Sequence, residues 1–289
     1  MQWFSFLLSL SALVGIVSAA QDNNGKTIVQ IVYDYDPNRV AAAVAGSLYL
    51  LCSVCLFARA VSNRAWWALC LPLGSMNMAM GFFIRIVLPN NPDSSMLFLS
   101  QQLLILLSPA AFLAFNYLLY GQFVADCLDP SYSRIPPRKA ATWFVISNLV
   151  SSLIQTVGGG LQTSKSVSTD KLGVNMVLAG LAIQTIPFAL FIFLCLHVYK
   201  HIRADGISLS SETWGPIVPA LLFSSATIML RCNYRITEYI QGSGGYLMTH
   251  ELWLYLLDAL PLFIGIIVYI PFWPSKYLVV KTDLPMSNF

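Results

Sequence analysis

The chain has 289 residues, of which 57% are hydrophobic and only 10% charged, and its formal net charge is +3. A soluble domain carries about 25% charged residues, and a soluble core of this size could not hide so much apolar surface. The composition therefore excludes a soluble protein and indicates an integral membrane protein. The small net charge and the lack of a basic run exclude nucleic acid as a partner.

The first 20 residues are typical of a secretory signal peptide. Residues 4–17 form an apolar core, and small residues follow through Ala20, although no Lys or Arg precedes the core. A core of about 14 residues is shorter than the ~20 that a membrane-spanning helix needs. We therefore predict a signal peptide at 1–20 and an extracytoplasmic segment at 21–39.

Seven apolar stretches follow, each near the length of a helix that spans a bilayer. We predict helices at 40–60, 66–88, 96–124, 140–161, 172–199, 214–239 and 252–272. The predicted fold class is an all-α integral membrane protein with seven transmembrane helices. Residues 40–272 form its membrane domain, and 273–289 form a short cytoplasmic tail.

The basic residues in the loops and at the ends of the predicted helices indicate the orientation, because the cytoplasmic side carries an excess of Lys and Arg. With the N-terminus outside, nine such residues fall on the cytoplasmic side and four on the other. The nine are Arg59, Arg64, Arg134, Arg138, Lys139, Lys200, Arg203, Lys276 and Lys281, and the four are Lys26, Arg39, Lys165 and Lys171. We predict an extracytoplasmic N-terminus and a cytoplasmic C-terminus.

Charged side chains stand inside the last two predicted helices. A charge at the bilayer centre costs about 2.5–3.5 kcal/mol on insertion scales, so such groups usually face the interior of a helix bundle. Their spacings of three, four and seven place them on one face of each helix. The sixth helix carries Arg231, Arg235 and Glu238. The seventh begins directly after Glu251 and carries the polar Tyr255 and the charged Asp258.

An antiparallel hairpin of these two helices would bring opposite charges to equal depth. If it turns near residues 243–244, residues at equal depth have numbers that sum to about 487. Glu251 then lies beside Arg235, and Asp258 lies within about 3 Å of the level of Arg231. We predict the ion pairs Arg235–Glu251 and Arg231–Asp258.

Glu238 is then left to face Arg235 or Arg85, which stands near the outer end of the second helix. Gln155 in the fourth helix and Gln184 in the fifth lie at similar depth. Together these side chains indicate a polar pocket in the outer half of the membrane. The ion pairs could simply lock helices together, or the same residues could bind a substrate or gate its passage, since intramembrane charges are usually functional.

No metal site or cofactor is predicted. His197 and His201 are spaced to share a metal, but the Glu of the H-E-x-x-H motif is missing. Cys52 and Cys55 form a C-x-x-C, but no second pair completes a zinc set.

These motifs resemble the fungal lipid-translocating exporter family, also called RTA-like. The last two helices carry the most specific part, R-x-x-Y-R-x-x-E-Y at 231–239 followed by Gly242, Gly245, Glu251, Tyr255, Asp258 and Pro261. The fourth helix adds Q-x-x-G-G-G at 155–160, and the fifth adds Gly173, Gly180 and Gln184. The chain departs from the family at Met78, Gln122 and Asn148, where the family usually has charged residues.

The resemblance implies a membrane protein that is not an enzyme and that exports or translocates lipid-like amphiphiles, such as sphingoid bases or sterol-like amines, in resistance to toxic compounds. Its partners would be membrane lipids or amphiphilic small molecules, and it would be located in the plasma membrane or an endomembrane. A cationic lipid could present its amine to Glu238, Glu251 or Asp258. Glu238 is the best candidate, because the predicted pairs leave it the least neutralised by arginine.

Two other functions remain open. The chain could be a seven-helix receptor that senses lipid, or a regulator of lipid asymmetry. It could also be an intramembrane metal-dependent hydrolase.

Overall fold

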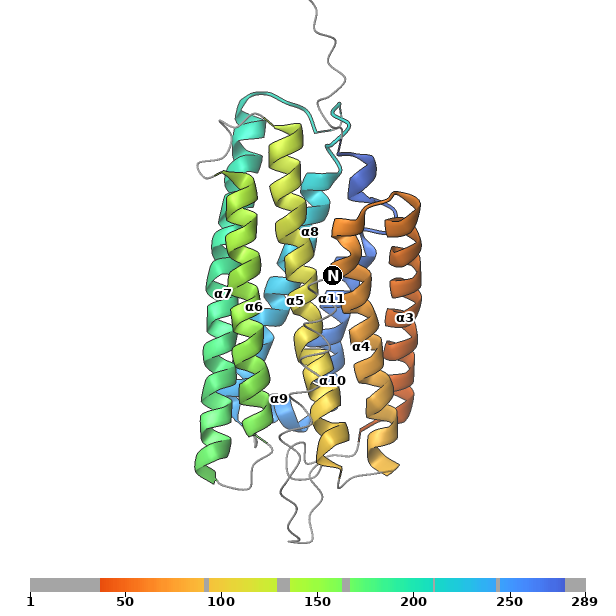
Figure 1. The fold of residues 1–289 in the computed structure, drawn as a ribbon, viewed down its shortest axis with the longest axis vertical. Coiled ribbons are helices and arrows are strands. Elements are labelled where there is room, and N and C mark those ends of the chain that lie inside the picture. Colours follow the sequence, from red (N-terminus) through yellow and green to blue (C-terminus); the bar gives the residue numbers. More distant parts are fainter. Residues whose placement is uncertain are drawn as a thin grey trace, which may run out of the picture.

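The computed structural model describes residues 37–90, 94–128, 136–162, 167–209, 211–242 and 245–278. In these ranges the chain is a bundle of long helices, and they contain no strand (Figure 1). The predicted signal peptide at 1–20 lies outside the described residues, as do residues 21–36 and 279–289 of the predicted terminal segments.

Six helical stretches are long and apolar enough to cross a membrane, and each overlaps a helix predicted from the sequence. The second stretch is an α-helix with a short 3-10 turn at each end. The stretches are α3 (Arg39–Ser62), η1 (Trp66–Leu69) with α4 (Cys70–Val87) and η2 (Leu88–Asn90), α5 (Ser95–Cys127), α6 (Pro137–Leu161), α7 (Val167–Ala204) and α8 (Ile217–Gln241). The protein is therefore an all-α membrane protein, as predicted.

The stretch predicted as the seventh span is a broken helix. A short helix α9 (Tyr246–Thr249) precedes α10 (Glu251–Trp253), the π-helical segment η4 (Leu254–Ala259) and α11 (Leu260–Ile267), and the 3-10 turn η5 (Pro274–Lys276) ends the described chain. Pro261 has no N–H to donate to the carbonyl of Leu257, and the N–H of Leu260 bonds the carbonyl of Tyr255, five residues back. The wider π-helical turn of η4 thus accommodates Pro261 within the helix. The count of seven spans and the orientation stay predictions.

The helix α5 is the centre of the bundle. Its most apolar stretch is 72% buried, whereas those of α3 and α7 are 33% buried, so α3 and α7 are peripheral. Consecutive helices from α3 to α7 pack side by side, and α8 packs against α7, α11 and α5 (Figure 1). The open faces of the outer helices are apolar, for example Val44, Leu48 and Leu51 on α3, as a lipid-facing surface must be.

Glycines allow α6 and α7 to approach closely. A Cβ atom added at Gly158 would lie 2.8 Å from the carbonyl oxygen of Gly173, and one added at Gly173 would lie 2.7 Å from the carbonyl oxygen of Gly158. Small residues at such positions let helix backbones touch in a membrane. This contact accounts physically for part of the G-G-G sequence at 158–160.

Candidate functional site

Two arginines of α8 share one carboxylate of η4. The Nε atom of Arg231 donates to Oδ1 of Asp258 at 2.7 Å, and Arg235 donates to the same carboxylate through Nε at 3.1 Å and Nη2 at 2.5 Å. Asp258 and Arg231 are fully buried. The predicted Arg231–Asp258 pair is confirmed, and Asp258 binds Arg235 as well.

Arg235 also reaches Glu238, one turn further along α8. Its Nη1 donates to Oε2 of Glu238 at 2.8 Å, and the hydroxyl of Tyr234 donates to Oε1 at 3.1 Å. The prediction that Glu238 faces Arg235 or Arg85 is confirmed for Arg235. Two arginines and two carboxylates thus form one group without net charge, which lowers the free energy of burying it.

The predicted Arg235–Glu251 pair is wrong, because Glu251 binds Arg85 of α4. Oε1 of Glu251 accepts from Nη2 of Arg85 at 3.0 Å and from the hydroxyl of Tyr255 at 3.2 Å. Its Oε2 accepts the backbone N–H of Asn38, at the start of α3, at 2.8 Å. Glu251 therefore ties the broken helix to α3 and α4.

The correction has two physical causes. The described residues between α8 and α10 include a further short helix, α9, whereas the prediction assumed only a tight turn between two helices. In addition, the π-helical turn carries an extra residue, so a spacing of seven no longer keeps Glu251 and Asp258 on one face. Asp258 consequently takes both arginines of α8, and Glu251 turns toward α4.

Gln155 and Gln184 bind each other. Nε2 of Gln155 donates to Oε1 of Gln184 at 2.7 Å and to Oγ of Ser151 at 2.8 Å, and Ser151 donates to the carbonyl of Gly180 at 2.6 Å. In the described part of the chain, these hydrogen bonds join α6 to α7 and do not lead to the charged residues. The structure thus places the two glutamines in a group of their own.

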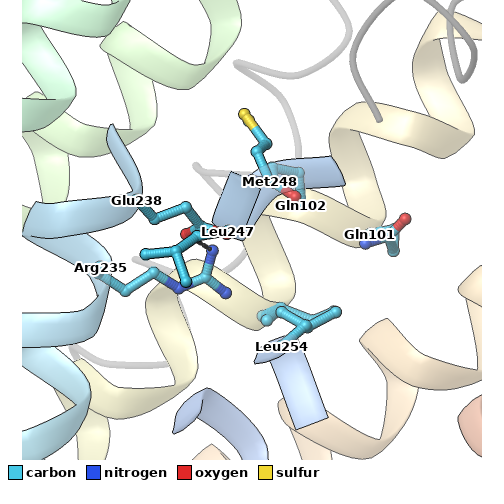
Figure 2. A pocket seen from close by; sticks show the side chains of 8 residues that line it. Gln101, Gln102, Arg235, Glu238, Leu247, Met248 and Leu254 are labelled. Carbon is cyan, nitrogen blue, oxygen red and sulfur yellow. Dashed lines mark hydrogen bonds and ion pairs between the residues drawn. The ribbon is translucent and has the colours of Figure 1, made fainter. Parts of the chain in front are cut away.

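A largely enclosed pocket lies beside the Arg235–Glu238 pair (Figure 2). It has room for about one water molecule. Side chains of four elements line it, namely Gln101, Gln102 and Ile105 of α5, Arg235 and Glu238 of α8, Leu247 and Met248 of α9, and Leu254 of η4. One ion pair and two amides thus stand beside apolar side chains.

Sequence reasoning missed the polar residues of α5. Gln101, which lines the pocket, is 1% exposed. Further along α5, Asn116 donates to Ser224 of α8 at 3.2 Å and accepts from the hydroxyl of Tyr269 at 2.9 Å. An amide within an apolar span is a signal of the same kind as a charge, and Gln101 and Asn116 could have been singled out on that ground.

Among the described residues, no three His, Cys, Asp or Glu side chains gather in a way that could hold a metal ion. The rings of His197 and His201 do lie together, with centroids 4.6 Å apart, at the end of α7.

Comparison with known proteins identifies the family. The family model described as "RTA1 like protein" matches residues 71–281, which run from the start of α4 to beyond η5. The chain belongs to the RTA1-like family. The matched range includes both arginines of α8, Glu238 and Asp258, so the RTA1-like family model covers the whole charged group. Membership, together with the six apolar spans, makes the chain an integral membrane protein.

Three curated proteins of Saccharomyces cerevisiae are similar to this chain. "Protoporphyrin uptake protein 1" is 32% identical over 74% of this chain and 72% of its own length. "Protein RTA1" is 31% identical over 68% of this chain and 62% of its own length. The "Sphingoid long-chain base transporter RSB1" of strain JAY291 is 27% identical over 78% of this chain and 69% of its own length. No solved structure matches the chain.

Proposed function

We propose that this protein transports or flips lipid-like amphiphiles that carry an amine head group, such as sphingoid bases or sterol-like amines, and so contributes to resistance. The observation that carries the proposal is the pocket beside Glu238, which joins a buried carboxylate to apolar side chains. The relative named as a sphingoid long-chain base transporter supports the same class of substrate. The plasma membrane is the proposed site of action.

The chemistry follows from the low dielectric of the site. Two opposite charges 4 Å apart attract by about 1 kcal/mol in water and by about 4 kcal/mol where the effective dielectric constant is about 20. A carboxylate that is 6% exposed, as Glu238 is, therefore attracts an ammonium group more strongly than a surface carboxylate does. The chain of the amphiphile would remain in contact with Leu247, Met248 and the surrounding hydrocarbon.

Each remaining predicted site residue has a proposed role at a distance from the amine. Asp258 holds Arg235 in place beside Glu238, and Arg231 fixes the carboxylate of Asp258. The contacts of Arg85, Glu251 and Tyr255 fix the broken helix against α3 and α4, so these residues act in gating. Gln155 and Gln184 hold α7 against α6 and limit the movement of the two helices.

Growth of fungal cells on toxic sphingoid bases and sterol-like amines tests this function. Cells with the wild-type gene should survive doses that kill deletion cells, and Glu238→Gln should fall to the deletion level because the neutral amide cannot pair with an ammonium group. Asp126→Asn is the matched control, since Asp126 pairs with the exposed Arg138 at 3.1 Å, outside the pocket. Equal survival of wild-type and deletion cells would refute the function, and full resistance with Glu238→Gln at normal membrane levels would refute the role of Glu238.

A further inference from the structure

Arg235 stands where the amine of a substrate would have to bind. Its Nη1 atom donates a hydrogen bond to Oε2 of Glu238 at 2.8 Å, and both residues line the pocket (Figure 2). The other oxygen of Glu238 accepts from Tyr234. The protein thus supplies its own nitrogen cation to the carboxylate that is proposed to bind the amine.

The three hydrogen bonds of Arg235 to carboxylates are divided unevenly. Nε and Nη2 bind Asp258, and only Nη1 binds Glu238. Loss of the Nη1 contact would leave Arg235 held by two hydrogen bonds to Asp258. The hydrogen bond between Arg235 and Glu238 can therefore break without any movement of α8 relative to η4.

The other arginine of the group differs in this respect. Arg231 binds Asp258 through Nε, and no hydrogen bond or ion pair in the described part of the chain joins it to Glu238. The two arginines carry the same charge, lie on the same helix and share one carboxylate. Only Arg235 can compete with a ligand for Glu238.

We propose that Arg235 is a built-in competitor, which occupies Glu238 when the site is empty and which an arriving ammonium group displaces. This inference rests on the proposed function, which assigns the amine to Glu238. Because Arg235 fills the site with an N–H donor, a ligand that replaces it in kind must also donate an N–H. The substrate class is therefore an amphiphile with a protonated amine, rather than a quaternary ammonium without N–H.

The competitor has a second effect, on release. The group of two arginines and two carboxylates is neutral, so it carries one positive charge once an ammonium group has joined it. Arg235 and the ligand then repel each other at short range in a site of low dielectric. Arg235 thus weakens binding and speeds release, which favours turnover over tight occupancy.

Liposomes that contain the purified full chain allow this to be measured with a fluorescent sphingoid base. Arg235→Gln should lower the KM for flux by about tenfold or more, because a charge-assisted hydrogen bond no longer competes, and should also lower the maximal rate. Arg231→Gln also removes one arginine that binds the carboxylate of Asp258. This variant should not have a lower KM than the wild type. Arg235→Lys, a second variant that retains the cation, should give a KM between those of wild type and Arg235→Gln.

The outcomes separate this inference from the function on which it rests. Absence of protein-dependent flux in the wild type would refute the proposed function. Wild-type flux with an unchanged or raised KM in Arg235→Gln would overturn the role of Arg235 alone, as would an equal fall in Arg231→Gln. If Arg235→Gln does not fold, an Arg235→Lys KM no lower than wild type has the same meaning. The N,N,N-trimethyl analogue should be carried at least about tenfold less efficiently by the wild type, and equal efficiency would refute the N–H requirement.

Discussion

Replacement of Asp258 by Asn removes the charge that holds two buried arginines. The carboxylate accepts three hydrogen bonds, one from Arg231 and two from Arg235. Arg235 keeps Glu238 after the change, but Nη1 and Nη2 of Arg231 have no hydrogen-bond partner among the described residues. Asp258→Asn therefore leaves Arg231 as a buried cation without a counter-charge of its own.

The contacts set the expected magnitude. Breaking a buried ion pair by removal of one partner costs about 3–5 kcal/mol, whereas an exposed pair contributes about 0–1 kcal/mol. Asp258 is fully buried, the side chain of Glu251 is 14% exposed, and Arg138, the partner of Asp126, is 76% exposed. The loss of stability should therefore decrease from Asp258→Asn through Glu251→Gln to Asp126→Asn.

Thermal unfolding in detergent, followed by tryptophan fluorescence, measures this order. A loss of 1 kcal/mol lowers the Tm of a large domain by about 2–4 °C, so Asp258→Asn should lower it by roughly 6–20 °C and Asp126→Asn by less than about 4 °C. Addition of Arg231→Met to Asp258→Asn should recover part of the loss, because it removes the unpaired charge. Equal Tm values for Asp258→Asn and Asp126→Asn would refute the reasoning from burial.

Two further predictions concern packing and a polar network, and both use the same unfolding assay. Gly158→Ala should lower stability by about 1–3 kcal/mol, because its Cβ would meet the backbone of Gly173 at 2.8 Å, whereas Gly159→Ala, whose Cβ would lie 3.5 Å from the nearest side chain, should have little effect; equal effects would contradict the close helix contact. Asn116→Leu should cost about 1–3 kcal/mol because it leaves the buried hydroxyl of Tyr269 without its acceptor, and the further change Tyr269→Phe should restore part of the loss. No recovery in the double variant would show that the loss has another cause.

The positions of the helices could be predicted from the sequence because membrane insertion depends on local hydropathy and length. Each of the six long spans overlaps its predicted range. The Arg231–Asp258 pair could also be predicted, since charges of opposite sign at equal depth in neighbouring helices attract strongly in a low dielectric.

The partners of Glu251 could not be predicted in this way. The prediction assumed a tight turn and a regular helix, but α9 and the π-helical turn at η4 change the phase of the seventh stretch. Pro261 was the available signal, because a proline near the middle of a span forces the helix to rearrange its hydrogen bonds. Its effect on the direction of Glu251 depends on how α3 and α4 pack, which hydropathy does not determine.

The residues that line the pocket could not be predicted from the sequence either. Gln101 and Gln102 of α5 lie far along the chain from Glu238, and no depth rule says which helices are neighbours in a bundle. The central place of α5 follows from its packing against α4, α6, α7 and α8 together. A depth argument can pair residues of adjacent helices, but it does not bring a third helix into the site.

The most direct test of amine transport is the rate at which a fluorescent sphingoid base crosses the bilayer of liposomes that contain the purified protein. Wild type and Asp126→Asn should raise this rate above that of protein-free liposomes, and Glu238→Gln should return it to the protein-free rate. Ligand-dependent association with a cytoplasmic protein, without any flux, would instead indicate a receptor. Equal rates in wild-type and protein-free liposomes would contradict the proposal that this protein moves amphiphilic amines.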